Sequence, residues 1–235
     1  GVAAVVSRDD FPAGGPLNSH YGRRLKDKTV VAMERVRHVG DVVAAIAAVD
    51  VATADAALRL IEVDYEDLPV VSDPLEAIRE GAPQLFDDLP EIKNNICHHT
   101  GVKDGDLEKG FRESDIILED TFTTPTTQHC HLEPHNSLAW FDDEGALTVQ
   151  TGTQTPFNVR KLLADVFKLP EEKVRVIVPY LGGGYGAKSH LKVEQLAAVL
   201  AWKAKRPVRV QLKRDEVFLT VTKHASVVRM KTGAK

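Results

Sequence analysis

A glycine-rich loop constrains the fold of this chain more than any other feature of its sequence. Between a β-branched run at residues 174–178 and an alanine-rich helical pattern stands the sequence GGGYGAKS, at residues 182–189. A strand that leads through such a loop into a helix presents backbone N–H groups where a phosphate or an oxyanion can approach without meeting a Cβ atom. We therefore interpret this segment as a cofactor-binding loop.

Two nucleotide-binding patterns nearly fit the loop. In a P-loop a glycine precedes the phosphate-binding lysine, whereas Ala187 precedes Lys188 here, and no apolar strand downstream ends in an aspartate suited to Mg²⁺. A dinucleotide fingerprint requires an acidic residue at the end of the next strand, but the run at residues 208–212 ends in Lys213-Arg214. A glycine turn that binds no ligand also fits this segment taken alone.

A second segment, which precedes strand-like residues 137–141, is rich in histidine. It reads Gln128-His129-Cys130-His131-Leu132-Glu133-Pro134-His135. A His-x-His pair on a strand places both rings on one face, and with a nearby carboxylate it is compatible with a three-ligand zinc or iron site. Packed histidines in a polar loop are the plainer alternative.

Together the two segments resemble the molybdenum-cofactor subunit of the xanthine dehydrogenase and aldehyde oxidase family of molybdenum hydroxylases. That family carries a Gln-x-His-x-x-Leu-Glu-Pro-His type motif and then Gly-Gly-Gly-Phe-Gly-x-Lys, and here both the order and the separation match. Two further family patterns, Ser-Thr-Gln-x-Pro and Gly-Arg-Pro-Val-Arg with Arg-x-Glu, resemble Thr151-Gly152-Thr153-Gln154-Thr155-Pro156 and Arg206-Pro207-Val208-Arg209 with Arg214-Asp215-Glu216. The resemblance extends over the whole chain.

The resemblance implies roles for individual residues. Gln128 matches the family glutamine whose amide hydrogen-bonds the oxo group of the molybdenum centre, and Tyr185-Gly186 matches the Phe-Gly whose backbone lies beside that centre. In this family the pterin dithiolene holds the metal, so the histidines are support and no side chain of this chain is a ligand. The expected cofactor-binding residues are Gln128, Gly182, Gly183, Gly184, Tyr185 and Gly186.

The resemblance also bears on substrate and partners. Ser189 takes the position where purine-oxidising members carry a glutamate, so a purine substrate is disfavoured, because a short hydroxyl lacks the charge and the reach. The family implies hydroxylation of an aldehyde or an N-heterocycle with oxygen from water, and a molybdenum-pterin cofactor in its cytosine dinucleotide form. The [2Fe–2S] cluster and FAD are expected on other subunits or domains, because two cysteines cannot supply four cluster ligands.

Composition sets outer bounds on the class of protein. The 235 residues, 43% of them hydrophobic and with a net charge of −4, suffice for one large or two ordinary domains. The mild acidity argues against a nucleic-acid partner, and no apolar run approaches the ~20 residues that span a bilayer. Cys97 and Cys130 stand in unlike contexts, and no signal pattern opens the chain, so we expect a soluble, cytoplasmic protein.

We expect an α+β chain with three consecutive segments. Residues 1–82 resemble the family's α/β hammerhead domain without its first strand, residues 83–105 form a linker, and residues 106–235 form the N-terminal portion of the molybdopterin-binding domain. The predicted strands are residues 2–6, 41–49, 61–65, 116–122, 137–141, 174–178 and 208–212. The predicted helices are residues 53–60 with Thr53 as N-cap, 74–80, 106–111, one opened by Thr155-Pro156, and one of about four turns that reaches Lys203.

The resemblance further indicates that the chain is part of a longer subunit. The family's catalytic glutamate lies beyond residue 235, so we expect the isolated piece to be inactive and the full-length enzyme to form an oligomer. Two other classes stay open. One is a phosphate-binding or nucleotide-binding module that holds ATP or NADP through Lys188 and Ser189, and the other is a scaffold that keeps the fold without the chemistry.

Overall fold

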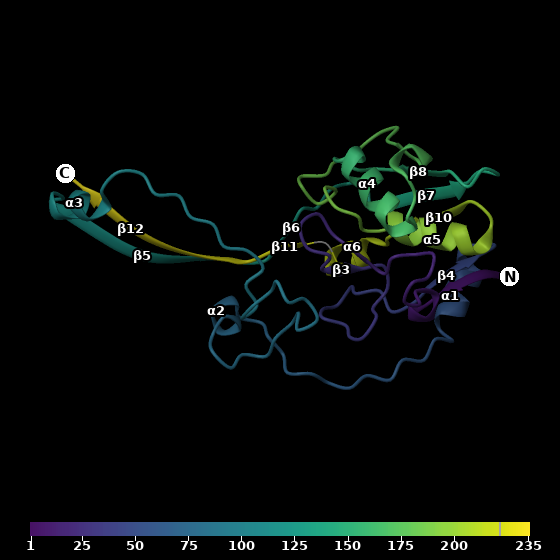
Figure 1. The fold of residues 1–235 in the computed structure, drawn as a ribbon, viewed down its shortest axis with the longest axis horizontal. Helices are drawn as coiled ribbons and strands as arrows, with labels where there is room; N and C mark the ends of the chain where they lie inside the picture. The colour runs from purple at the N-terminus through teal and green to yellow at the C-terminus, as the bar shows by residue number, and fades with distance from the viewer. Residues whose placement is uncertain (221) are drawn as a thin grey trace. The chain divides into compact units, whose positions relative to one another are not determined.

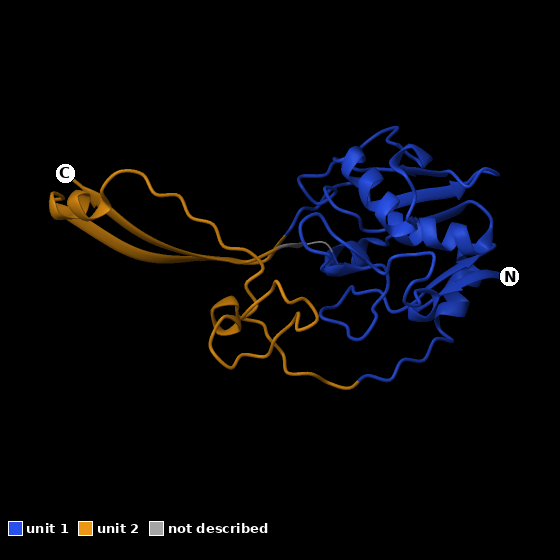
Figure 2. Cartoon of the chain, viewed as in Figure 1, with its two compact units in different colours: residues 1–65, 128–222 blue, residues 66–127, 223–235 orange. Residues whose placement is uncertain are grey.

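The chain divides into two compact units, each built from segments far apart in the sequence (Figure 2). The computed structural model describes residues 1–220 and 222–235. Unit 1 comprises residues 1–65 and 128–222, and unit 2 comprises residues 66–127 and 223–235. This grouping follows spatial packing and differs from the three consecutive segments expected above, whose boundaries stay a prediction. None of the helices in the described part of the chain is long and apolar enough to cross a membrane.

A four-stranded sheet organises the second segment of unit 1, in the order β10-β7-β8-β9 (Figure 1). Its strands are β7 (Asn136–Phe141), β8 (Leu147–Thr151), β9 (Val174–Ile177) and β10 (Val208–Gln211). Strand β7 is antiparallel to both of its neighbours, whereas β8 and β9 run parallel. The last three strands of the sequence-based prediction are thereby confirmed within one or two residues.

Two helices cover this sheet. Helix α4 (Pro156–Phe167) packs against β9, and its buried side chains recur at the predicted spacing, with proline in the first turn, where no N–H is needed. Helix α5 (Glu194–Ala204) packs against β7 and β10. It is about three turns long, so the predicted four-turn helix was too long.

The first segment of unit 1 packs on the same helix α5. Strands β1 (Val2–Val6) and β4 (Ala45–Ala48) form an antiparallel pair that contacts α5, so the strand predicted at residues 41–49 exists only in its second half. The other short elements of unit 1 are η1 (Arg8–Asp10), β2 (His20–Tyr21), β3 (Lys28–Thr29), η2 (Glu171–Lys173) and α6 (Arg214–Thr220).

Two predictions near helix α1 (Val51–Leu58) were wrong. Asp50, and not Thr53, is the N-cap, because its Oδ1 accepts the Thr53 N–H bond at 2.7 Å and so satisfies an amide that the helix leaves unpaired. Residues 61–65 form no strand. Their side chains are mostly exposed, and a lone extended segment without a partner strand has no ladder to stabilise it.

One hydrophobic core joins the two segments of unit 1. The buried side chains come from the N-terminal strands and loops as well as from the sheet, α4 and α5, and the largest that are almost wholly buried include Val6, Val30, Val31, Leu147, Val149, Leu163, Leu191 and Leu200. Helices and mostly antiparallel strands therefore share one core, and the chain is an α+β protein.

Unit 2 is built around a long two-stranded ribbon and two short helices. Strands β5 (Ile116–Thr124) and β12 (Ser226–Ala234) pair antiparallel along their whole length, and both are exposed. Helices α2 (Pro74–Ala77) and α3 (Leu107–Arg112) begin at the caps Asp73 and Asp106, which confirms both predicted helices, with α2 shorter than expected. Strands β6 (Thr127–Gln128) and β11 (Thr222–Lys223) lie where the chain passes between the units.

Candidate functional site

The glycine loop that follows β9 depends on backbone conformations that favour glycine. Gly183 and Gly186 have φ angles of +88° and +95°. Residues with a Cβ atom are strained at such angles, so the backbone conformation of the loop requires glycine at both positions. Tyr185 lies between them at φ +53°, a left-handed conformation that costs a non-glycine residue on the order of 1–3 kcal/mol. Its ring is largely exposed, so the strain is not offset by burial.

The other two glycines allow close contact with side chains from elsewhere in unit 1. A Cβ atom at Gly182 would lie 2.6 Å from Cβ of Glu133, and one at Gly184 would lie 2.5 Å from Oε1 of Gln154. The same Gln154 oxygen accepts the Gly186 N–H bond at 2.9 Å. The segment that contains Glu133 and the segment that contains Gln154 therefore both touch the loop directly.

The segment that joins β8 to α4 holds the second half of the loop through hydrogen bonds to its carbonyl groups. Both the Gln154 N–H and the Thr153 hydroxyl donate to the Lys188 carbonyl oxygen, at 2.9 and 3.0 Å. The Thr155 hydroxyl donates to the Ser189 carbonyl oxygen at 3.1 Å. The Thr-Gln-Thr-Pro motif and the glycine loop, two separate motifs in the sequence, thus form one structure.

An ion pair that no sequence motif predicted connects the histidine-rich segment to the loop. The Lys188 ammonium group lies 2.6 Å from Oε2 of Glu133, and only 1% of the lysine side chain is exposed. The same Oε2 accepts the Gly182 N–H bond at 2.9 Å, and Oε1 accepts a bond from Asn136 at 3.2 Å. Burial raises the pKa of the Glu133 carboxyl, but the hydrogen bonds from Lys188, Gly182 and Asn136 outweigh it and hold that pKa below its ordinary value.

His131 and His135 use one ring nitrogen each to bind a backbone carbonyl. Nδ1 of His131 donates to the Glu133 oxygen at 2.6 Å, and Nε2 of His135 donates to the Ala187 oxygen at 3.3 Å, so each tautomer is fixed by its acceptor. The rings meet edge to face with centroids 4.9 Å apart. Burial lowers the pKa of both imidazoles, that of His135 to about 4. Both rings are therefore neutral at pH 7.

The described residues contain no group of three or more His, Cys, Asp or Glu side chains arranged to hold a metal ion. Nε2 of His131 and Nδ1 of His135 are buried and find no hydrogen-bond partner in the described part of the chain. Backbone carbonyls and the edge-to-face ring contact hold the two histidines in place, and the zinc or iron alternative stays a hypothesis.

Gln128 lies next to the loop through helix α6. Its Nε2 donates to the Val217 carbonyl oxygen at 3.1 Å, and its Oε1 accepts the His129 N–H bond at 2.8 Å. Val217 is wholly buried and packs its side chain with Ala187 of the loop and with Leu212. Val217 therefore contacts both Gln128 and Ala187 of the loop, and so links the two.

The first residue of α6 fixes the histidine-rich segment. The Arg214 guanidinium donates to the carbonyl oxygens of His131 and Leu132, at 2.9 and 2.6 Å. Glu216 accepts the Lys213 N–H bond at 2.6 Å and so stabilises the start of this helix. The Arg-x-Glu pattern consequently anchors the histidine-rich segment beside the loop.

The start of helix α5 is separate from the loop. Glu194 is the first residue of α5, and Oε2 of its carboxylate accepts the N–H bonds of Lys192 and Val193, just before the helix, at 2.9 and 3.2 Å. Its Oε1 accepts a bond from the Thr151 hydroxyl at 2.9 Å. The expectation of a glycine loop that opens directly into a helix was wrong, because residues 190–193 separate the loop from α5.

Three consecutive backbone N–H groups of the loop are available to a ligand. Those of Gly183, Gly184 and Tyr185 donate to no acceptor in the described part of the chain. A row of unpaired amides suits an oxo or phosphate oxygen of a cofactor. The residues present therefore fit the cofactor that the sequence motifs imply.

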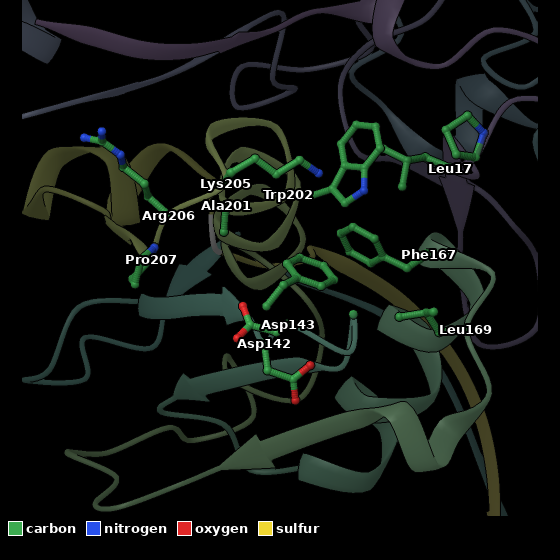
Figure 3. A pocket seen from close by; sticks show the side chains of 13 residues that line it. Leu17, Asp142, Asp143, Phe167, Leu169, Ala201, Trp202, Lys205, Arg206 and Pro207 are labelled. Carbon is green, nitrogen blue, oxygen red and sulfur yellow. The ribbon is translucent and has the colours of Figure 1, made fainter.

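A cavity of about 420 Å³ lies at the other end of β7 from this loop (Figure 3). The side chains of Trp202, Phe167 and Leu169 surround it, with Asp142 and Asp143 from the turn after β7 at one side. Arg206 and Pro207 of the Arg-Pro-Val-Arg pattern line it, but its lining includes no residue of the glycine loop or of the histidine-rich segment.

Comparison with known proteins decides the family. The model of the molybdopterin cofactor-binding domain matches residues 89–235, more than half of the chain, and that of the aldehyde oxidase and xanthine dehydrogenase a/b hammerhead domain matches residues 1–69. The chain belongs to the xanthine dehydrogenase and aldehyde oxidase family. Its fold is the hammerhead domain followed by the first part of the molybdopterin-binding domain, as the motifs predicted.

Individual relatives of this family agree over the whole chain. A probable xanthine dehydrogenase subunit of Bacillus subtilis is 38% identical over 100% of this chain and 30% of its own length. The nicotinate dehydrogenase large molybdopterin subunit of Eubacterium barkeri is 32% identical over 100% of this chain and 53% of its own length. This chain therefore spans a third to a half of these relatives.

Two solved structures support the fold. Quinoline 2-oxidoreductase from Pseudomonas putida 86 superimposes with a TM-score of 0.86 at 28% identity, which covers 100% of this chain and 30% of that one. The CO dehydrogenase of Oligotropha carboxidovorans gives a TM-score of 0.81 at 30% identity, over 100% and 31% of the two chains.

Proposed function

We propose that this chain lines the molybdenum-pterin cofactor of a molybdenum hydroxylase through its glycine loop. The observation that carries this proposal is the row of unpaired N–H groups at Gly183, Gly184 and Tyr185, held in place by two separate motifs. When bound, the cofactor supplies the oxidation chemistry. The chain supplies fixed N–H dipoles, which stabilise developing negative charge without having to reorganise.

Gln128 and the loop residues Gly182, Tyr185 and Gly186 complete the proposed cofactor-binding set. Hydrogen bonds with Val217 and His129 fix the orientation of the Gln128 side-chain amide. A residue that offers a hydrogen bond to a cofactor needs such a fixed orientation. Tyr185 is exposed and strained, and strained residues cluster at functional sites. The role proposed for each residue rests on its match to a family motif and on this position.

The proposed reaction is hydroxylation of an aldehyde or an N-heterocycle with oxygen from water. Ser189 favours a substrate other than a purine, since its short side chain follows the buried Lys188 and carries no charge. The isolated chain should lack activity, because the glutamate that the family uses as base lies outside these residues. Serine at this position therefore favours the proposed substrates over xanthine.

The proposed partners are a [2Fe–2S] protein or domain and an FAD protein or domain, with the cofactor in its cytosine dinucleotide form. Support comes from the two exposed cysteines, which are too few for a cluster, and from relatives whose names denote single subunits.

We also propose that the hammerhead domain ends at residue 82 and that the linker to the cofactor domain ends at residue 105.

The nucleotide-binding alternative finds no supporting observation. A P-loop lysine must extend toward phosphate, whereas the Lys188 ammonium group is buried and paired with Glu133. The Glu194 carboxylate binds the two amides just before helix α5, so a negative charge already lies beside this helix terminus and disfavours a bound phosphate.

Metal and pterin analysis of the full-length protein, purified from its native host, tests the proposal. We expect close to one molybdenum atom per subunit, together with a pterin nucleotide released by denaturation. A full-length protein that contains no molybdenum when its host is grown with molybdate would refute the proposed function.

A further inference from the structure

We propose that Glu133 and Lys188 act as a pair of positioning residues that set the conformation of the glycine loop toward the cofactor. The inference rests on the proposed function for its last step, the link to the cofactor. The earlier step, that the pair orders the loop, stands on the structure alone.

The pair joins the two ends of the loop at one atom. Oε2 of Glu133 accepts bonds from the Gly182 N–H group at 2.9 Å and from the Lys188 ammonium group at 2.6 Å. In the reverse direction, the Glu133 N–H group donates to the Gly182 carbonyl oxygen at 3.0 Å. The three amides proposed to face the cofactor lie between these two anchored residues. A shift of the carboxylate therefore moves both ends of the amide row.

The loop has few other means of staying in place. Tyr185 is exposed, the glycines carry no side chains, and Ala187 is the buried apolar residue of the segment. Loops without apolar anchors rely on polar contacts for their order. The remaining contacts, from Gln154 and the neighbouring threonines, hold the second half of the loop and leave Gly182 to Glu133 alone.

Charge makes the two residues interdependent. The Lys188 side chain is 1% exposed. Among the described residues, it forms an ion pair with Glu133. Removal of one partner leaves a buried charge without compensation, whereas removal of both relieves that penalty. Because Lys188 is the more deeply buried charge, a positioning pair predicts that the double variant is better ordered than the single glutamate variant.

Four variants of the full-length protein test the inference. Glu133→Gln keeps an oxygen for Gly182 but removes the charge, Lys188→Met leaves the carboxylate unpaired, and the third variant combines both. Glu76→Gln is the matched control, because Glu76 forms an exposed ion pair of the same 2.6 Å length with Arg79 in unit 2. Two quantities are measured: amide hydrogen exchange of residues 182–189 in protein made without molybdenum, and molybdenum content per folded subunit in protein made with it.

We expect Glu133→Gln to speed exchange in the loop at least tenfold and to lower molybdenum content at least fivefold, with smaller changes in Lys188→Met and in the double variant. The control should change neither. Unchanged exchange in Lys188→Met and in the double variant would overturn the pair's ordering role, even if Glu133→Gln does not fold. Faster exchange with full molybdenum content per folded subunit would overturn positioning toward the cofactor. Absence of molybdenum from the native protein would refute the proposed function, while the exchange data would still decide the first step.

Discussion

A Cβ atom at Gly184 would collide with Gln154, since it would lie 2.5 Å from the Oε1 atom that accepts the Gly186 N–H bond. Gly184 does not have a positive φ angle, unlike Gly183 and Gly186. It must be glycine because a side chain reaches across it, and not because of its own backbone. The loop therefore uses glycine for two different physical reasons within a few residues.

Gly184→Val in the full-length protein should displace Gln154, release Gly186 and abolish molybdenum retention. Overpacking of this kind costs roughly 1–3 kcal/mol. Molybdenum content by mass spectrometry and thermal unfolding are the measurements. Gly101→Ala is the control, because no atom lies within 4 Å of a Cβ at that position. Full metal content in the valine variant would remove the cofactor-loop interpretation.

Gln128→Ala should lower turnover roughly 10–100-fold, the scale of losses when groups around a metal centre are removed. The lost hydrogen bond to Val217 contributes only about 0.5–1.5 kcal/mol, so the melting temperature should fall by only a few degrees. Turnover is measured on the most active member of a panel of aldehydes and N-heterocycles. A variant that folds poorly while its folded fraction keeps full turnover would show that Gln128 is structural.

Acidification should destabilise unit 1 through His135. Burial lowers the pKa of His135 from 6.5 to about 4, so the unfolded chain binds more protons than the folded one between these values. Stability is therefore unaffected by this group above pH 6.5 and decreases as the pH falls toward 4, by roughly 3 kcal/mol in total.

Thermal unfolding of the full-length protein between pH 7 and pH 4.5 checks this prediction. His135→Gln keeps a donor for the Ala187 carbonyl but cannot titrate, so its melting temperature should fall less steeply with pH. The exposed His98→Gln serves as control and should follow the unsubstituted protein. Identical slopes for all three proteins would show that His135 does not carry the effect.

Lys188 and Ser189 should not bind a nucleotide. Isothermal titration with Mg-ATP and with NADPH should show no saturable binding tighter than about 1 mM, which corresponds to roughly −4 kcal/mol. The reason is that Lys188 is committed to Glu133 and that Ala187 replaces the glycine a P-loop needs. Micromolar binding that Lys188→Ala abolishes would move the protein into the nucleotide-binding class.

Ser189 should make xanthine a poor substrate of the full-length enzyme. A site without the glutamate loses an ionic contact to the purine, and a hydrogen bond to a charged group contributes about 1.5–3 kcal/mol. We expect kcat/KM for xanthine to lie at least tenfold below that for the best aldehyde or N-heterocycle. Xanthine as the preferred substrate would contradict the specificity proposed for Ser189.

Local patterns predicted the elements whose cause is local. Helix α4 follows from apolar spacing and from Pro156 in its first turn, and the glycine loop follows from its composition. The strand expected at residues 61–65 failed because strand formation depends on a partner, which no local pattern reports. The predicted cap of α1 was wrong because Asp50, three residues before Thr53, also has a capping side chain and accepts the Thr53 N–H bond.

The contacts that assemble the site could not be predicted from the sequence, for a related reason. Glu133 and Lys188 are 55 positions apart, and both are charged types that are usually exposed. Each appeared in a motif, but nothing in the order of residues indicates that one carboxylate oxygen receives both Lys188 and Gly182. The signal that existed was the presence of an acidic and a basic residue in two motifs that the family resemblance assigns to one cofactor site.

The two tryptophans of the chain, Trp140 on β7 and Trp202 on α5, belong to the sheet and its covering helix, and Trp202 lines the cavity of Figure 3. The glycine loop carries only Tyr185 as an aromatic residue. Indole emission, excited selectively at the red edge of protein absorption, consequently reports the state of the sheet and is blind to rearrangement of the loop. A loop variant that keeps its emission spectrum has an intact interior, so an ordinary fluorimeter separates damage to the cofactor site from damage to the fold.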